Sequence, residues 1–420
     1  MKIGNSSSSS EEEEKDRISN LPDSLIEHIL SFTDTKSAVQ TCVLAKRWRY
    51  IWISLPVLTF YDTYHSIDED FGVNPTKRFI KFVDKVLSLR DNNSDIRRFD
   101  LHYDVYFSTT DEIYSCMDRW IATAVSHNVQ EMCICVTPDR DFEIPLCLCT
   151  CKSLTKLELE LSGYGDSYYY TEIILPDHEM SLPLLKSLRL ILWDISFDDE
   201  ELTNRFFSSF PSLESLVMRV HDNPFPEMNL NISLPKLKYF EFDSWGYESN
   251  CEVKLHAPSL SSFIFRSYLS TNLSLMNLSS LATADIEIRI GRSEVPEMCA
   301  QRAMGLLRGI HDVEVLTLDH NFLEVEFDPD NIGDDWDAGL SLPCRICHLK
   351  IAEIKGLRGH AIELKFLELL LKHATVLEKV VLTNYSTEQD SEREKRMTKF
   401  SETLLTFPTT SKKILILLKF

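Results

Sequence analysis

The chain is poor in glycine and has no long apolar run. Only 12 of its 420 residues are glycine, and none of them forms the phosphate-cradling loop of a nucleotide site or the nucleophile elbow of a hydrolase. No stretch of about 18 apolar residues occurs, so the sequence offers no candidate membrane span. Residues 1–15 also lack the apolar core of a signal peptide. We therefore expect a soluble protein made in the cytosol, whose 11 cysteines are reduced thiols.

Basic clusters are a second absence. The chain carries 65 acidic residues against 44 Lys and Arg, a formal net charge of −21. Nucleic acids and anionic membrane surfaces attract proteins through clustered Lys and Arg, so we predict neither a nucleic-acid nor a membrane partner. The basic pairs Lys46-Arg47 and Lys412-Lys413 are too short for an import signal, which leaves cytoplasm and nucleus both open.

Metal ligands are present only in incomplete sets. Cys344 and Cys347 have zinc-ligand spacing with His348 beside them, but no second ligand pair accompanies them. Five further cysteines lie between residues 133 and 151. Two of these, Cys133 and Cys135, occupy alternate positions of a predicted strand, where small apolar side chains fit. We interpret all of these cysteines as structural thiols.

Other candidate sites fail in a similar way. The acidic segment 324–337 includes a stretch, 328–333, that resembles a calcium loop, but Ile332 and Gly339 stand where oxygen ligands are needed. His178-Glu179 lacks the second histidine of a zinc-protease helix, because Leu182 occupies its place. We predict no catalytic residues, no metal and no cofactor, and hence a protein that is not an enzyme.

The most informative segment runs from residue 16 to residue 52. It holds three short amphipathic stretches in under 40 residues, opening with LPDSLIEHILSF and closing with VLAKRWRYIW. So small a helical unit cannot bury all of its apolar side chains within itself, which predicts a surface for a partner. At these residues the chain resembles the plant F-box family, with two departures: Thr33-Asp34 stands where Leu-Pro is common, and Ala45 where Ser is usual.

The resemblance implies a function for this segment. F-box domains dock the Skp-type adaptor of a cullin-based ubiquitin ligase, so the expected partners are the adaptor, a cullin through it, and an unknown protein to be ubiquitinated. The predicted adaptor-binding residues are Leu21, Pro22, Leu25, Ile29, Leu30, Val43, Leu44, Trp48, Ile51 and Trp52.

After residue 55 the pattern apolar-x-x-apolar-x-apolar recurs twelve times, 21 to 41 residues apart. Its middle position falls at Leu58, Phe99, Met132, Leu157, Leu188, Leu216, Phe240, Phe263, Ala284, Leu316, Leu349 and Val380. Each copy ends with the period-two alternation of a half-buried strand, and helical stripes lie between copies within 79–87, 113–124, 299–310 and 362–373. Helix then strand, repeated, predicts an irregular leucine-rich-repeat solenoid of the α/β class, with parallel strands on the concave side and helices outside. An ordinary α/β domain is the alternative.

Residues from about 340 onward carry a second resemblance. Gly359 with Glu363, the run LLLKHATVLEKVVL and the segment 408–411 before a last strand are similar to the FBD region that follows the repeats in many plant F-box proteins. The expected organisation is therefore a disordered Ser/Glu-rich tail (1–15), an F-box (16–60), a solenoid (61–340) and an FBD-like cap (341–420).

The residues between the apolar positions of each strand should project from the concave face. Arg and Tyr most often anchor protein interfaces. The predicted target-binding residues are Arg189, Arg219, Tyr239, Glu241 and Arg266.

Two further readings stay open beside the substrate-recognition subunit. In one, the chain is a non-catalytic solenoid scaffold or receptor whose N-terminal helices only cap the repeats. In the other, a small molecule fills a pocket between solenoid and target, although the sequence lacks the basic cluster that a highly phosphorylated ligand would need.

Overall fold

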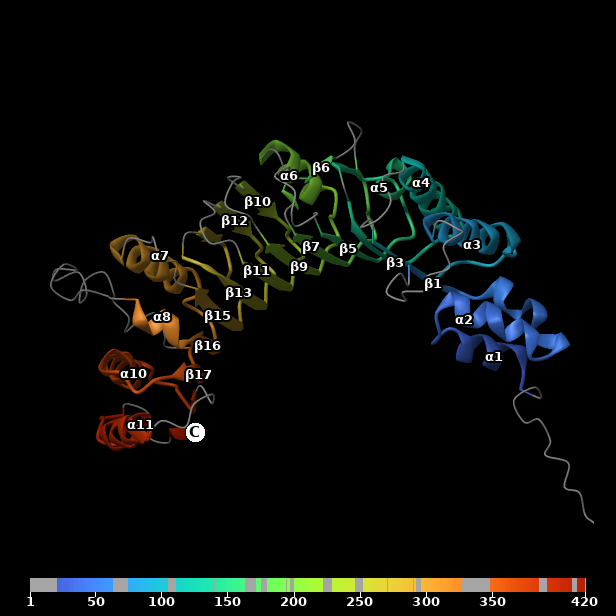
Figure 1. The fold of residues 1–420 in the computed structure, drawn as a ribbon. Helices are drawn as coiled ribbons and strands as arrows, with labels where there is room; N and C mark the ends of the chain where they lie inside the picture. The colour runs from blue at the N-terminus through green and yellow to red at the C-terminus, as the bar shows by residue number, and fades with distance from the viewer. Residues whose placement is uncertain are drawn as a thin grey trace, which may run out of the picture. The chain divides into compact units, whose positions relative to one another are not determined.

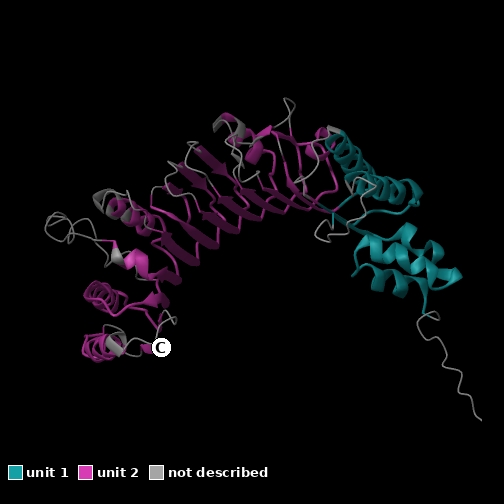
Figure 2. Cartoon of the chain, viewed as in Figure 1, with its two compact units in different colours: residues 1–102, 112–129 teal, residues 103–111, 130–420 magenta. Residues whose placement is uncertain are grey.

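The computed structural model describes residues 21–62, 75–104, 111–138, 140–162, 171–174, 180–193, 195–196, 200–221, 229–245, 252–269, 271–289, 291, 296–325, 348–384, 391–409 and 414–419. The chain divides into two compact units (Figure 2). Unit 1 comprises residues 1–102 and 112–129, and unit 2 comprises residues 103–111 and 130–420. None of the helices in these described ranges has the length and apolar content that a membrane span requires.

Unit 1 begins with four short helices, shown in blue in Figure 1. They are α1 (Asp23–Leu30), α2 (Thr35–Gln40) and two 3-10 helices, η1 (Thr41–Val43) and η2 (Lys46–Ser54). The helices bury a small apolar core of their own, made by Ile26, Leu30, Ala38, Trp48, Ile51 and Leu55. Two departures from the usual F-box pattern, Thr33 and Asp34, serve the turn between α1 and α2. Thr33 donates its hydroxyl to Leu30 O at 2.8 Å, and the Asp34 carboxylate caps α2 by accepting Ser37 N–H at 2.8 Å.

The remainder of unit 1 pairs two strands with two helices. Strands β1 (Val57–Tyr61) and β2 (Arg98–Asp104) run parallel, and the chain between and after them forms α3 (Pro75–Leu89) and α4 (Asp111–Ser126). The two helices meet at Trp120, whose indole N–H donates to Asp84 at 2.7 Å and whose ring packs edge-on against Phe79. Arg90, itself buried, donates to the carbonyl oxygen of Leu55 at 2.6 Å and so fixes the end of the F-box core to the loop after α3.

Unit 2 is built on one long parallel sheet. Its strand order is β3-β5-β7-β9-β11-β13-β15-β16-β17-β18-β19. The bounds are β3 (Glu131–Thr137), β5 (Lys156–Ser162), β7 (Ser187–Trp193), β9 (Ser215–His221), β11 (Tyr239–Ser244), β13 (Ser262–Tyr268), β15 (Thr283–Arg289), β16 (Val315–Asp319), β17 (Ile351–Leu357), β18 (Lys379–Asn384) and β19 (Leu415–Lys419). Every second side chain is buried on one face, and the phenylalanines of β11 and β13 stack there in register, Phe240 on Phe263 and Phe242 on Phe265. The predicted strands and their parallel alignment are confirmed.

Two kinds of element cover the buried face of this sheet. Helices α5 (Leu146–Cys149), α6 (Glu200–Ser208), α7 (Pro296–Gly309), α8 (His320–Glu324), α10 (Ala361–His373) and α11 (Ser391–Leu404) form one kind. Short parallel strands form the other, in the sheets β10-β12-β14 (Asn229–Ser233, Glu252–His256, Asn272–Met276) and β4-β6-β8 (Phe142–Glu143, Thr171–Ile174, Ile195–Ser196). The opposite face of the long sheet, called here the open face, has none of these elements over it among the described residues (Figure 1).

The outer strands correct the expectation that helices fill the outside. Strands β10, β12 and β14 lie in the connections of β9 to β11, β11 to β13 and β13 to β15. These are the repeats in which the pattern recurs after only 24, 23 and 21 residues. So few residues leave too little chain for a helix with its two turns, and an extended segment makes the return instead.

One copy of the repeat lies three residues later than the sequence pattern indicated. The middle position predicted at Leu349 belongs to Ala352, which pairs with Leu316 of β16 and Val380 of β18 and is buried as they are. Leu349 instead fills the first apolar position. The register shifts between Ile354 and Leu357, where Gly356 adopts a left-handed φ of 77° and forms a bulge in β17.

Candidate protein-binding surfaces

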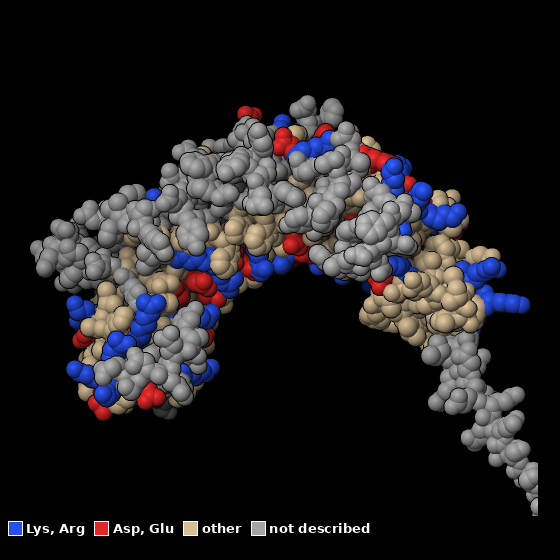
Figure 3. All heavy atoms as spheres, viewed as in Figure 1, with Lys and Arg blue, Asp and Glu red and all other residues tan. Residues whose placement is uncertain are grey.

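The F-box helices leave large apolar side chains exposed. On α1, Leu25 and Ile29 follow one another at helical spacing, with Phe32 one turn further along. Val43 and Leu44, at the end of η1, are 83% and 70% exposed, and Phe32 is 77% exposed. Much of the surface over these helices in Figure 3 is free of charged atoms. An exposed group of this kind marks a protein interaction site more often than a solvated surface.

Three predicted adaptor-binding residues are not on that surface. Leu30, Trp48 and Ile51 are 3%, 5% and 7% exposed and belong to the F-box core. The prediction that they form part of an open patch is wrong: α1 is apolar on two faces, and the face that carries Leu30 turns inward against η2.

The remaining predicted residues divide between the edge of the core and the surface. Leu21 and Trp52 are half-buried against the core, and the Trp52 indole N–H donates to Arg49 O at 3.1 Å. Pro22 lies one residue before α1, where its carbonyl oxygen accepts the N–H groups of Leu25 and Ile26. Leu25, Ile29, Val43 and Leu44 are exposed, as contact with an adaptor would require, and their role in adaptor binding stays a prediction. Phe32 and Tyr50 are exposed as well and were not predicted, although Phe32 continues the helical spacing of Leu25 and Ile29, so the signal for it was present in the sequence.

The positions predicted to project from the sheet do lie on the open face of unit 2. Arg189 on β7 pairs with Glu158 on β5 at 3.0 Å, and Arg219 on β9 pairs with Glu241 on β11 at 3.0 Å. The phenol of Tyr239 donates to the second oxygen of Glu241 at 2.7 Å. Burial and the Glu241 carboxylate raise the pKa of Tyr239 to about 12, so the phenol keeps its proton.

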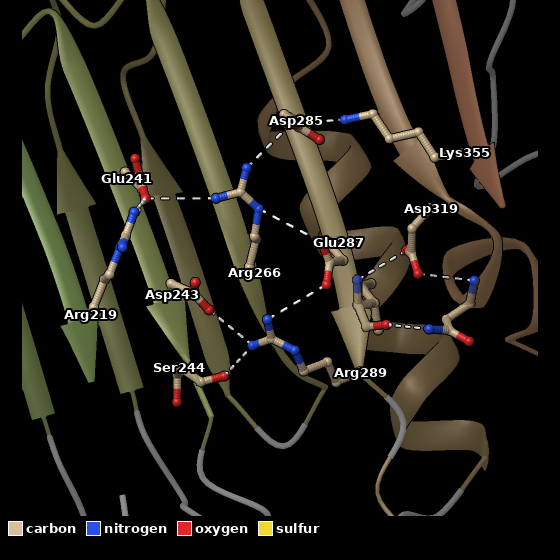
Figure 4. Close-up of polar contacts among 12 residues, drawn as sticks. Arg219, Glu241, Asp243, Ser244, Arg266, Asp285, Glu287, Arg289, Asp319 and Lys355 are labelled. Carbon is tan, nitrogen blue, oxygen red and sulfur yellow. Dashed lines mark hydrogen bonds and ion pairs between the residues drawn. The ribbon is translucent and has the colours of Figure 1, made fainter. Parts of the chain in front are cut away.

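Arg266 connects this group to the next strand. Its guanidinium lies 3.6 Å from Glu241 on one side and 3.7 Å from both Asp285 and Glu287 of β15 on the other (Figure 4). Lys355 of β17 adds a contact to Asp285 at 3.3 Å. Burial raises the pKa of Glu241, but hydrogen bonds from Tyr239 and Arg219 and the nearby positive charges outweigh it, and the net pKa is lowered.

The network joins positive and negative side chains in alternation (Figure 4). Such a surface favours neither a polyanion nor a polycation over its whole area. It can instead present fixed, oriented hydrogen-bond groups to a folded partner or a peptide.

A row of aromatic side chains at the carboxyl ends of the strands was not predicted. Trp193 of β7, His221 of β9 and Trp245 after β11 occupy neighbouring positions in register, and the Trp193 and His221 rings stack at a centroid distance of 4.6 Å. Arg289 of β15 places its guanidinium 3.9 Å from the centre of the Trp245 ring. The sequence did contain a signal for this row. Both tryptophans stand an even number of residues after an open-face position of their strand, so the alternation of side chains places them on the same face.

The cysteines described by the structure are free thiols. Cys149 and Cys151 are buried, and desolvation together with the charge of Cys147 raises the pKa of Cys149 to about 12. Among the described residues, no three His, Cys, Asp or Glu side chains come together in a way that could hold a metal ion. The Ser/Glu tail, the segment 326–347 with its cysteine pair and the pair at 178–179 lie outside the described residues.

Comparison with known proteins agrees with this architecture. The family model "F-box domain" matches residues 18–60, the model "FBD-associated F-box protein At5g56370, LRR repeats" matches residues 117–324, and the model "FBD" matches residues 341–382.

Three relatives from Arabidopsis thaliana are similar over most of the chain. Putative F-box/FBD/LRR-repeat protein At5g44950 is 30% identical over 334 residues, covering 76% of this chain and 70% of the relative. Putative F-box protein At3g44060 is 31% identical over 306 residues, with 73% and 67% covered. Putative F-box/LRR-repeat protein At3g58880 is 29% identical over 323 residues, with 74% and 67% covered. With an F-box, leucine-rich repeats and an FBD region in this order along the sequence, the chain belongs to the F-box/FBD/LRR-repeat family of plant proteins.

Proposed function

We propose that this protein is a substrate receptor of an SCF-type ubiquitin ligase, in which the F-box helices bind the Skp-type adaptor and the open face of unit 2 binds the protein to be ubiquitinated. F-box proteins generally act as substrate receptors in such ligases, and F-box/leucine-rich-repeat proteins are typically non-catalytic adaptors. The observation that carries the proposal for this chain is the exposed apolar set Leu25, Ile29, Phe32, Val43 and Leu44 on the F-box helices.

The receptor would act by proximity. Binding the target next to a conjugating enzyme turns transfer to an acceptor lysine into an effectively intramolecular reaction, so the receptor itself needs no reactive side chain.

The experiment is a binding titration of purified full-length chain against the Skp-type adaptor. The variant Ile29→Lys/Val43→Lys places charge among exposed apolar positions and should weaken adaptor binding at least about tenfold, since each buried charge without a partner costs more than about 1 kcal/mol. The matched control is Lys36→Glu, which changes charge on the exposed surface of α2 and should bind as the parent chain does. Equal adaptor affinity of the double variant and the parent would contradict the proposal, as would a parent chain that fails to bind at micromolar concentration.

The scaffold alternative has a specific observation in its favour. The hydroxyl of Thr35 on α2 accepts Thr59 N–H of β1 at 2.8 Å, so the F-box helices do fasten the first strand of the repeats in unit 1. If capping were their only role, Thr35→Val would lower the thermal stability of the chain, and neither the parent nor the Ile29→Lys/Val43→Lys variant would bind the adaptor.

A further inference from the structure

The Trp193 ring has one face against His221 and the other toward a small neighbour. Ser162 of β5 occupies the register position beside Trp193, opposite to the side where His221 stacks. Trp193 is 43% exposed, and within the described part of the chain His221 is the one ring that stacks on it. Among the described residues, the second face of the indole is therefore uncovered, with Ser162 beside it.

The second group of interest is Glu160, a carboxylate near this face that has no ion-pair partner among the described residues. Glu160 is two residues before Ser162 on the same strand and on the same face of the sheet, with Ile191 as its register partner. From strand spacing and rise, its Cα lies roughly 8 Å from that of Trp193, within reach of one bound side chain. Glu158, Glu241, Asp243, Asp285 and Glu287 all have Arg or Lys partners on the open face, whereas Glu160 has none among the described residues.

The chain itself shows what such a pair of groups can hold. Two strands further along the same row, the Arg289 guanidinium lies over the Trp245 ring at 3.9 Å and contacts the carboxylates of Asp243 and Glu287. Trp193 and Glu160 offer the same two kinds of group without a cation among the described residues. The carboxylate comes here from the neighbouring strand β5, because Ile191 occupies the position that Asp243 has relative to Trp245. A cation on a Trp face gains more than on Phe or Tyr, and a nearby carboxylate adds to it.

We propose that Trp193, Ser162 and Glu160 form a subsite for a single Arg or Lys side chain of the target protein, with the cation on the open face of Trp193 and its charge paired with Glu160. The inference rests on the proposed role of the open face in target binding and names the chemistry of the residue bound. The net charge of −21 favours a partner segment that is basic around this residue, because the field of the chain attracts it.

The test uses full-length chain labelled with ¹⁵N-tryptophan and the peptide acetyl-Gly-Ser-Gly-Arg-Gly-Ser-Gly-amide. The Trp193→Phe variant assigns the Trp193 indole signal. We expect this signal to shift in a saturable way with the arginine peptide, and not with peptides that carry citrulline or glutamate in place of arginine. Glu160→Gln should weaken the peptide affinity about fivefold, the worth of one exposed ion pair. Glu131→Gln, at the other end of the neighbouring strand on the same face, is the matched control and should leave it unchanged.

Three results would overturn the subsite: no saturable shift at millimolar peptide, equal binding of the citrulline peptide, or a shift at Trp245 in place of Trp193. Adaptor binding is measured on the same samples. A chain that binds the adaptor but not the peptide contradicts the subsite alone, whereas a chain that binds the peptide but not the adaptor contradicts the proposed ligase function.

Discussion

Arg289, at the end of β15, bonds Asp243 of β11 and so reaches across the intervening strand β13: the distance from Nη1 to Oδ1 is 3.0 Å. The same nitrogen donates to the carbonyl oxygen of Ser244 at 2.7 Å (Figure 4). The guanidinium also lies over the Trp245 ring, 3.9 Å from its centre. The two charged side chains are only 13% and 10% exposed. One arginine thus fixes the carboxyl end of β11 to β15 on the open face.

Replacing Arg289 by Met should therefore destabilise unit 2. Asp243 would stay largely buried without its counter-charge, and the free energy of unfolding should fall by about 3 kcal/mol, as when one partner of a buried pair is removed. Urea unfolding followed by circular dichroism measures the change. The double variant Arg289→Met/Asp243→Asn should recover part of the loss. Lys238→Met, which removes the exposed pair with Glu214, serves as the control and should leave the midpoint in place. If Arg289→Met left the free energy of unfolding unchanged, the hydrogen bond across β13 would contribute nothing to stability.

Within the F-box, the buried residues should determine stability and the exposed apolar residues should determine adaptor binding. Trp48→Ala empties a buried position and should lower the free energy of unfolding by about 3 to 5 kcal/mol. Val43→Ala changes an exposed side chain, so its stability should stay within about 0.5 kcal/mol while its adaptor affinity falls. Thermal unfolding and the adaptor titration on the same two variants check this. If Val43→Ala unfolds as early as Trp48→Ala, the division between core and exposed set is wrong.

The sequence predicted the repeats well because each strand must bury every second side chain. Because of this requirement, Leu or Phe recurs at fixed spacing in the sequence. The spacing correctly located the strands that contain Phe240 and Phe263. It failed at β17, where Ala352 is small and Ile351 beside it is larger. The register with β16 determines which residues of β17 are buried. Hydrophobicity alone placed Leu349 in the middle position of the pattern, which Ala352 occupies.

The F-box surface could be predicted only in outline. The adjacent pairs Leu25-Ile26 and Ile29-Leu30 make α1 apolar on two faces, so periodicity fixes a helix but not the face that turns inward. Only packing against η2 decides that Ile26 and Leu30 are buried. The open-face network was out of reach for a related reason: parity assigns Arg266 to a face, but which of several carboxylates it contacts depends on rotamers.

Asp319 should make the stability of unit 2 depend on pH. Its carboxylate ends β16, accepts the N–H of Ile288 at 3.0 Å and caps α8 through Asn321 and Phe322. Burial, with a smaller addition from the Glu287 charge, raises its pKa from 3.8 to about 6 against the lowering effect of these three N–H groups. The folded chain then holds the proton more tightly than the unfolded chain. The stabilising effect of protonation is complete below about pH 4 and is lost as the pH rises to about 6.

The measurement is the free energy of unfolding of the parent chain and of Asp319→Asn between about pH 4 and pH 7. Asn keeps a capping oxygen but carries no titrating group. The parent should lose about 2 kcal/mol relative to the Asn variant across this interval, since one pKa unit corresponds to about 1.4 kcal/mol. Parallel pH profiles would show that Asp319 has an ordinary pKa in the folded chain. If the parent instead gained stability relative to Asp319→Asn as the pH rises, the pKa of Asp319 in the folded chain would be lowered.

Gly359 and Glu363 together shape the turn that leads into α10, within the segment that matches the FBD model. The buried Glu363 carboxylate accepts three consecutive backbone N–H groups, from Arg358 at 3.0 Å, Gly359 at 2.8 Å and His360 at 2.9 Å. Gly359 can turn the chain around this carboxylate because its φ is +81°, and an added Cβ would lie 3.1 Å from the sulfur of Met397 on α11. Carboxylate and turn therefore depend on one another.

Glu363→Gln should lower the free energy of unfolding by about 2 kcal/mol, because one amide oxygen replaces two charged acceptors and leaves buried N–H groups without a partner. Gly359→Ala should cost about 1 to 2 kcal/mol through the left-handed φ. Glu368→Gln, on the exposed side of the same helix, is the matched control and should change nothing measurable. Hydrogen exchange at residues 358–360 reports the site directly. Faster exchange in Glu363→Gln but not in Glu368→Gln is expected, and equal exchange in the two would show that the carboxylate does not hold the turn.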